Sequence, residues 1–87
     1  MKEEIEQRRR QRRDFMTELY RVTDGSVSEF VSAYEIGTDI LIPNSDIKRL
    51  LAYLEEKEFI KVDDHKLGVI RMTANGIDYV EGLSDES

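Results

Sequence analysis

Pro43 stands between two helical patterns and limits how the middle of this chain can fold. Proline lacks a backbone N–H and restricts the residue before it, so a helix arriving from the N-terminal side must end there. Ser32 and Glu35 have the spacing of a helix capping box, which places the start of that helix near Ala33. Gly37 lies inside the helix, where a missing Cβ allows another helix to pack closely. One short helix is therefore predicted, beginning near Ala33 and ending at Pro43.

Apolar residues recur at helical spacing on both sides of this proline. On its N-terminal side they are Ile36, Ile40 and Leu41. On its C-terminal side they are Ile47, Leu50, Leu51 and Leu54, at i, i+3, i+4 and i+7. Three residues that favour a helix start precede this second run, namely Asn44, Ser45 and Asp46. A second, amphipathic helix is therefore predicted from residue 44 to about Lys57, directly after a tight turn.

Two β-prone runs follow the second helix. They are FIKV at residues 59–62 and VIRM at residues 69–72, with DDHKLG between them. This pattern predicts a β-hairpin whose loop contains Gly68. Upstream of both helices, the segment VSEFV at residues 27–31 predicts a short strand beside the hairpin, with Phe30 and Val31 anchored in the core.

Helices are also predicted at both ends of the chain. Residues 3–22 contain no Pro or Gly, and their apolar side is formed by Phe15, Met16, Leu19 and Val22. Upstream of these only Ile5 is apolar, so the first three turns are expected to project from the body. Gly25 suits a left-handed end to this helix. Thr73 can cap a final helix from Ala74 to about Gly82.

The composition excludes several classes of site. The chain has 87 residues and no Cys, which excludes disulfides and thiolate metal sites, and His65 is its one histidine. The sequence contains no Ser/His/Asp pattern, metal-ligand pattern or Gly-rich phosphate loop, so we expect no enzyme and no cofactor. No stretch approaches the ~20 apolar residues of a membrane span. A single soluble, cytoplasmic domain is expected.

Charge is distributed unevenly along the chain. The net charge is −6, yet residues 1–13 hold six basic and three acidic residues, whereas residues 14–87 hold seven basic and sixteen acidic ones. Glu4 and Glu6 can pair with Arg8 and Arg10 at i, i+4, so the Arg-rich run can be a solvated helix with local ion pairs. The same run can also be a basic arm that contacts phosphate or an acidic partner. The sequence leaves both interpretations open.

Three segments resemble the winged helix-turn-helix superfamily, and in particular its bacterial and archaeal regulator-like members. They are YEIGTDILIPNSDIKRLLAYLEEKEFI, the hairpin, and VIRMTANGIDYVE, which is similar to the ending that often follows the wing. The resemblance covers residues 14–83. It implies an α+β fold with a three-helix core, a short two-stranded wing, a long N-terminal helix and a C-terminal helix. We therefore expect an Arg-rich helical extension at 1–13, a winged-helix domain at 14–83 and an acidic tail at 84–87.

The resemblance also implies double-stranded DNA as the partner. The helix after Pro43 corresponds to the recognition helix, whose outward residues enter the major groove. Here these are Asn44, Ser45, Lys48, Arg49 and Ala52. On the wing, Lys66 and Arg71 would attract phosphate, and in the N-terminal arm Arg8, Arg9 and Arg12 would lie near the duplex.

Two functional hypotheses follow from these observations. The first is a DNA-binding transcriptional regulator that acts as a homodimer through its N-terminal and C-terminal helices. The second is a protein-interaction module that binds no DNA, in which the acidic surface docks a basic protein. The helix-turn-helix pattern supports the first hypothesis, whereas the net charge of −6 and the two Asp of the wing support the second.

Overall fold

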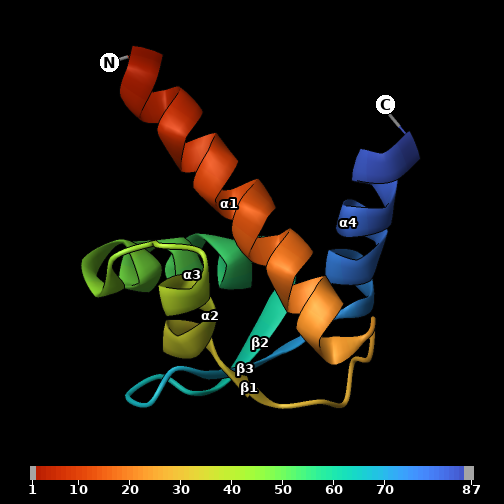
Figure 1. Ribbon diagram of the computed structural model, residues 1–87. Helices are drawn as coiled ribbons and strands as arrows, with labels where there is room; N and C mark the ends of the chain where they lie inside the picture. Colours follow the sequence, from red (N-terminus) through yellow and green to blue (C-terminus); the bar gives the residue numbers. More distant parts are fainter. Residues whose placement is uncertain (1, 86–87) are drawn as a thin grey trace.

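Four helices and a three-stranded antiparallel sheet form an α+β fold over residues 2–85, the part of the chain that the computed structural model describes (Figure 1). The helices are α1 (Lys2–Thr23), α2 (Ala33–Asp39), α3 (Asn44–Glu56) and α4 (Ala74–Asp85). The strands are β1 (Val31–Ser32), β2 (Ile60–Asp64) and β3 (Val69–Met72). The predicted order of elements is confirmed. Glu86 and Ser87 of the expected acidic tail lie outside the described residues.

The sheet has the strand order β1-β3-β2. The predicted hairpin is confirmed as β2 and β3, and Gly68 takes the left-handed conformation in the connection, with a φ of 69°. A short strand beside the hairpin is also found, since Val31 pairs with Ile70 of β3, but it is β1 (Val31–Ser32) and shares only Val31 with the predicted segment 27–31. The sheet therefore has three strands, one more than the two expected for the hairpin alone. A register shift between Val62 and Asp64 gives β2 an irregular end.

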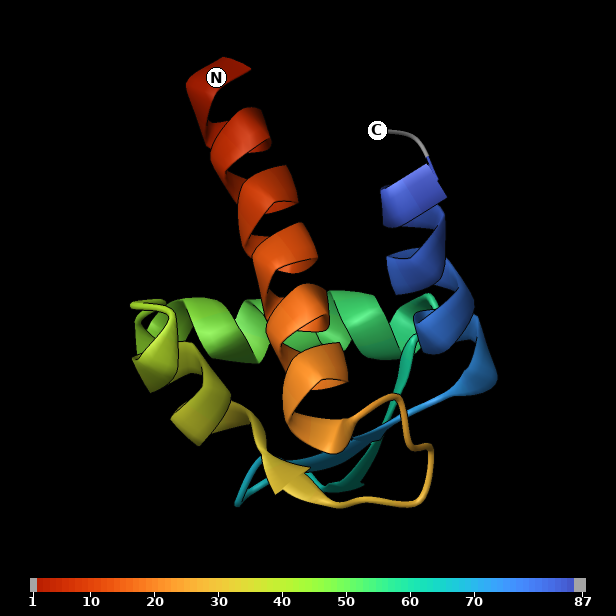
Figure 2. The ribbon, with the colours of Figure 1, turned by 45° about the vertical axis from the view of Figure 1, so that its right-hand side comes forward.

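One hydrophobic core joins the helices to one face of the sheet. The second helical pattern is confirmed, since all four of its apolar residues are buried in α3. The other core side chains are Phe15, Met16, Leu19, Ala33, Ile36, Ile42, Ile60, Ile70, Met72 and Val80. Figures 1 and 2 show the first turns of α1 rising beyond α3, away from the sheet, where Ile5 is half exposed. The α1 helix continues without a break through residues 13 and 14.

The capping predictions hold at two helix starts, and the prediction for Gly37 holds as well. The Ser32 hydroxyl accepts a hydrogen bond from the Glu35 N–H at the start of α2. The Thr73 hydroxyl accepts one from the Gly76 N–H at the start of α4. A Cβ on Gly37 would lie 2.6 Å from Ile47 Cδ1, so the glycine permits α2 and α3 to pack closely.

The prediction that Leu41 lies on the buried face of the first short helix is wrong. The α2 helix ends at Asp39, and the Ile42 N–H donates to the Gly37 carbonyl at 2.8 Å, which reverses the chain before Pro43. Leu41 occupies the left-handed position of this turn, with a φ of 63°, and is 90% exposed. Ile42 takes the place in the core instead.

The prediction that Phe30 is a core residue is also wrong, because its side chain is 57% exposed. Successive side chains of an extended segment point to opposite sides. Val31 packs against the core, so its neighbour Phe30 points outward, where its ring lies 5.9 Å from the Arg71 guanidinium.

Candidate nucleic-acid interface

The outward face of α3 carries the main group of predicted contact residues. Because an α-helix has ~3.6 residues per turn, Ser45, Arg49 and Ala52 lie opposite the buried side of α3. Lys48 lies on the flank nearer the hairpin. All four side chains are exposed. Asn44, the first residue of α3, is exposed beside α2, in a depression that Tyr34 and other α2 residues line. The structure thus brings together the five residues predicted on this helix.

The hairpin forms one border of this face. Lys48, Ala52 and Lys66 line a hollow of about 310 Å³ between α3 and the hairpin. Tyr34 of α2 lines the same hollow, and a Cβ on Gly68 would lie 2.7 Å from its ring. The aromatic ring therefore packs on the glycine and holds the hairpin connection close to α2. Lys66 is placed on the same side of the molecule as the exposed face of α3.

Carboxylates near the hairpin tip interact with groups of the protein itself. Asp64 Oδ1 accepts hydrogen bonds from the N–H groups of Lys66 and Leu67, each at 2.9 Å. Glu55 Oε1 lies 3.4 Å from Nε2 of His65. The two Asp of the wing supported the hypothesis of a protein partner. The structure shows that one of them, Asp64, accepts hydrogen bonds that stabilise the turn of the hairpin.

The N-terminal helix α1 forms the opposite border. The Arg12 guanidinium lies 3.6 Å from the centre of the Tyr53 ring, a cation–π contact between α1 and α3. Gln11 Nε2 donates to Asp46 Oδ2 at 3.1 Å, and Arg49 donates to the other oxygen of the same carboxylate at 3.3 Å. These contacts tie α1 to α3 both at its first turn, through Asp46, and nearer its C-terminal end, through Tyr53.

A second hollow, of about 180 Å³, lies between α1 and α3 and is lined by Arg8, Arg12 and Arg49. Gln11 and Tyr53, which also line this hollow, were not among the contact residues predicted from the sequence. Helical spacing could have indicated the position of Gln11. Residues 12, 11 and 8 precede Phe15 by three, four and seven positions, so they lie on the same side of α1 as the buried Phe15. Arg9 is exposed on α1 but does not line the hollow.

Arg71 lies apart from the other predicted residues. Ile70 and Met72 are buried under the helices, and alternation along β3 directs Arg71 to the other face of the sheet. There its guanidinium donates to the Val27 carbonyl at 3.4 Å, and its Nε lies 3.7 Å from Asp63 Oδ2. Arg71 therefore anchors the segment before β1, on the face of the sheet that is turned away from the core.

The pKa shifts with a clear physical cause lie in the C-terminal half of α1, away from this face. A side-chain hydrogen bond from Arg21 holds the pKa of the Glu18 carboxyl below its ordinary value. The Tyr20 hydroxyl donates to Glu81 Oε2 at 2.9 Å, which raises the pKa of Tyr20. The second contact links α1 to α4.

The described residues contain neither a candidate metal site nor a candidate membrane span. Within residues 2–85, no group of three or more His, Cys, Asp or Glu side chains could hold a metal ion. None of the helices in that range has both the length and the apolar character needed to cross a lipid bilayer. Comparisons of the chain with protein-family models, with curated proteins and with solved structures gave no match.

Proposed function

We propose that this chain is a winged-helix protein that binds double-stranded DNA, with α3 in the major groove and the β2–β3 hairpin as the wing. We further propose that it acts in the cytoplasm as a transcriptional regulator. The observation that carries the proposal is the arrangement of cations around α3. Its exposed face holds Lys48 and Arg49, and it is bordered by Lys66 on the hairpin side and by Arg8 and Arg12 on the α1 side.

The side chains on this face suit contacts to base edges. Lys48 and Arg49 can donate to the guanine acceptors O6 and N7, and Asn44 can pair with adenine. Ser45 can donate to a phosphate oxygen, and the small side chain of Ala52 lets the helix approach the floor of the groove. Glu55 and Glu56 limit these contacts to the first turns of α3, which is where recognition helices contact bases.

The carboxylate in the first turn of α3 interacts with groups of the protein itself. The Asp46 carboxylate lies between the Gln11 amide and the Arg49 guanidinium, at 3.1 and 3.3 Å. The charges of Asp46 and Arg49 offset each other, so the pair adds little net potential at this point of the face. The cost is that Arg49 must share its donors between Asp46 and DNA.

The number of cations predicts modest affinity for a single chain. Lys48, Arg49, Lys66, Arg8 and Arg12 are the candidates for phosphate contact, and each neutralised phosphate contributes ~0.9 to the slope of log affinity against log salt. A homodimer joined through α1 and α4 would double the number of contacts. We include this dimer in the proposal because the N-terminal turns of α1 extend beyond the body of the molecule (Figure 2).

The proposal is tested by fluorescence anisotropy with a mixed-sequence duplex over a salt series, with the oligomeric state measured by light scattering in the same buffers. We expect Lys48→Ala and Arg49→Ala each to weaken binding by about 1 kcal/mol or more. Lys57→Ala is the matched control, since Lys57 follows the C-terminal end of α3 and lies 5.9 Å from the Tyr53 ring. The affinity should fall steeply with salt.

Equal effects of the three variants would refute the assigned contact face. A protein that binds only one specific operator can show no binding to a mixed-sequence duplex. The second experiment is therefore selection of bound sequences from a random duplex pool at about 50 mM salt. Failure of both experiments would reject DNA binding and favour the acidic protein-interaction module.

A further inference from the structure

The strand β2 has a free edge. The strand order β1-β3-β2 gives β2 a partner on one side only. An unpaired strand edge presents main-chain N–H and C=O groups that can pair with another extended chain. The other outer strand, β1, has two residues, whereas β2 has five. The edge of β2 is therefore the longer of the two and the better suited to accept an added strand.

The hydrogen-bond pattern shows which main-chain groups point outward. The Thr73 N–H donates to the Phe59 carbonyl at 3.2 Å, so these two residues form a hydrogen-bonded pair at the start of the hairpin. Hydrogen-bonded and non-hydrogen-bonded pairs alternate along an antiparallel ladder. The next residue that directs its main chain toward β3 is Lys61, opposite Arg71. Ile60 and Val62 consequently direct their N–H and C=O groups to the free edge.

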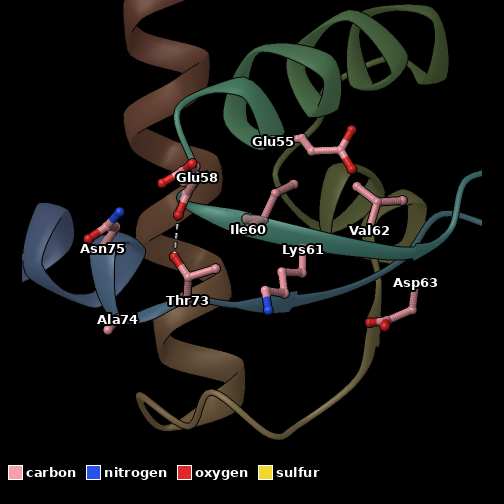
Figure 3. A pocket seen from close by; sticks show the side chains of 9 residues that line it. All are labelled: Glu55, Glu58, Ile60, Lys61, Val62, Asp63, Thr73, Ala74 and Asn75. Atoms are coloured by element: carbon pink, nitrogen blue, oxygen red, sulfur yellow. Dashed lines mark hydrogen bonds between the residues drawn. The ribbon is translucent and has the colours of Figure 1, made fainter.

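A hollow of about 600 Å³ runs along this edge (Figure 3). Figure 3 shows Glu55 on the side of α3, Glu58 just before the start of β2, and Asn75 on the side of α4, beyond that end of the strand. The Thr73 hydroxyl donates a hydrogen bond to the Glu58 carbonyl, which joins the two walls at one end of the strand. Neighbouring strands lie ~4.8 Å apart, so an extended segment can lie in the hollow beside β2.

The charges around the hollow indicate which segment would fit. Glu55, Glu58 and Asp63 line it, and Lys61 is its one basic lining residue. A second copy pairing through the same edge would bring two sets of these carboxylates together, and DNA would be repelled. A segment with Lys or Arg side chains is favoured, because its cations would approach Glu58 and Glu55 from the added strand.

We propose that the edge of β2 binds an extended, basic segment of a partner protein as an additional strand of the sheet. The main-chain groups of Ile60 and Val62 supply the hydrogen bonds, and the carboxylates of Glu55 and Glu58 select for positive charge. This mode of recognition takes affinity from the main chain and specificity from side chains. The site lies along the edge of the sheet and does not depend on the proposed binding of DNA.

The experiment uses the full chain labelled with ¹⁵N and three synthetic peptides. The first alternates Lys and Val, the second alternates Glu and Val, and the third is the Lys–Val peptide with N-methyl groups on the amides of one edge. We expect the first peptide to shift the amide signals of Ile60 and Val62 and to slow their hydrogen exchange. The other two peptides should bind at least about threefold more weakly, one through charge and one through lost hydrogen bonds.

Charge variants test the selection for basic segments. Glu58→Lys should weaken binding of the Lys–Val peptide by about threefold or more at low salt. Glu29→Lys changes the net charge by the same amount near β1, at the opposite edge of the sheet, and should leave binding unchanged. Lack of binding, equal binding of the N-methylated peptide, or amide shifts elsewhere in the protein would each overturn the proposal.

Discussion

Two glycines in α4 allow the same substitution to be tested in opposite environments. A Cβ added to Gly76 would lie 2.2 Å from the Phe59 carbonyl oxygen and 3.0 Å from Met16 Cε. A Cβ added to Gly82 would meet no atom of the described residues within 4 Å. We therefore expect Gly76→Ala to destabilise the protein and Gly82→Ala to stabilise it.

The magnitudes follow from the two environments. At Gly82 the gain is the helix propensity of Ala over Gly, ~0.5–1 kcal/mol. At Gly76 the new methyl group must move the start of α4 away from Phe59, whose ring stacks on Tyr79 at 4.7 Å. Overpacking of this kind costs ~1–3 kcal/mol, and the gain in propensity offsets less than ~1 kcal/mol of it. The two variants should differ by about 2 kcal/mol.

Urea and thermal unfolding followed by circular dichroism would measure this difference. For a domain of this size, 1 kcal/mol corresponds to ~4–8 °C in Tm, so the two variants should differ by roughly 10 °C. The unfolding slope in urea should remain equal to that of the parent protein, since the surface exposed on unfolding does not change. A Gly76→Ala variant as stable as the parent would refute the close packing of α4 on Phe59.

Two further outcomes are expected. Glu58 lies just after the C-cap of α3 in the left-handed conformation, with a φ of 61°. Glu58→Gly should therefore raise the free energy of unfolding by about 1 kcal/mol in urea titrations, and an unchanged midpoint would contradict this. The hydrogen bond to Glu81 raises the pKa of Tyr20, so the neutral phenol is favoured in the folded state. This contribution to stability is present below the ordinary pKa of tyrosine and is lost as the pH rises through the folded-state pKa. An NMR titration should show Tyr20 returning toward its ordinary pKa in Glu81→Ala, and the same raised titration in that variant would exclude Glu81 as the cause.

Most of the helices and strands were predicted correctly from local sequence patterns. The periodic apolar residues of α3 and the caps at Ser32 and Thr73 act over one or two turns, so their spacing in the sequence is sufficient to identify them. The end of α2 could not be found in this way. The turn after α2 places Leu41 in a left-handed conformation, which is more common for Gly or Asn. The turn forms because it buries Ile42 in the core.

The candidate interface was predicted only in part. Asn44, Ser45, Lys48, Arg49 and Ala52 lie close together on one helix, so their common face follows from the helical repeat. The grouping of Arg8 and Arg12 with Arg49 required the packing of α1 on α3, which includes the contact between Arg12 and Tyr53.

The sequence by itself determined the order and approximate positions of the helices and strands, the apolar face of α3, and that the chain lacks cysteine and carries a net charge of −6. Only the tertiary structure decided which charges share a surface. It placed Arg71 on the far face of the sheet, paired Asp46 with Gln11, and left one edge of β2 open beside Glu55 and Glu58. The physical reason is the separation of the interacting residues along the chain. Helical periodicity and capping act between residues a few positions apart, whereas these contacts join distant residues that burial of the common core brings together.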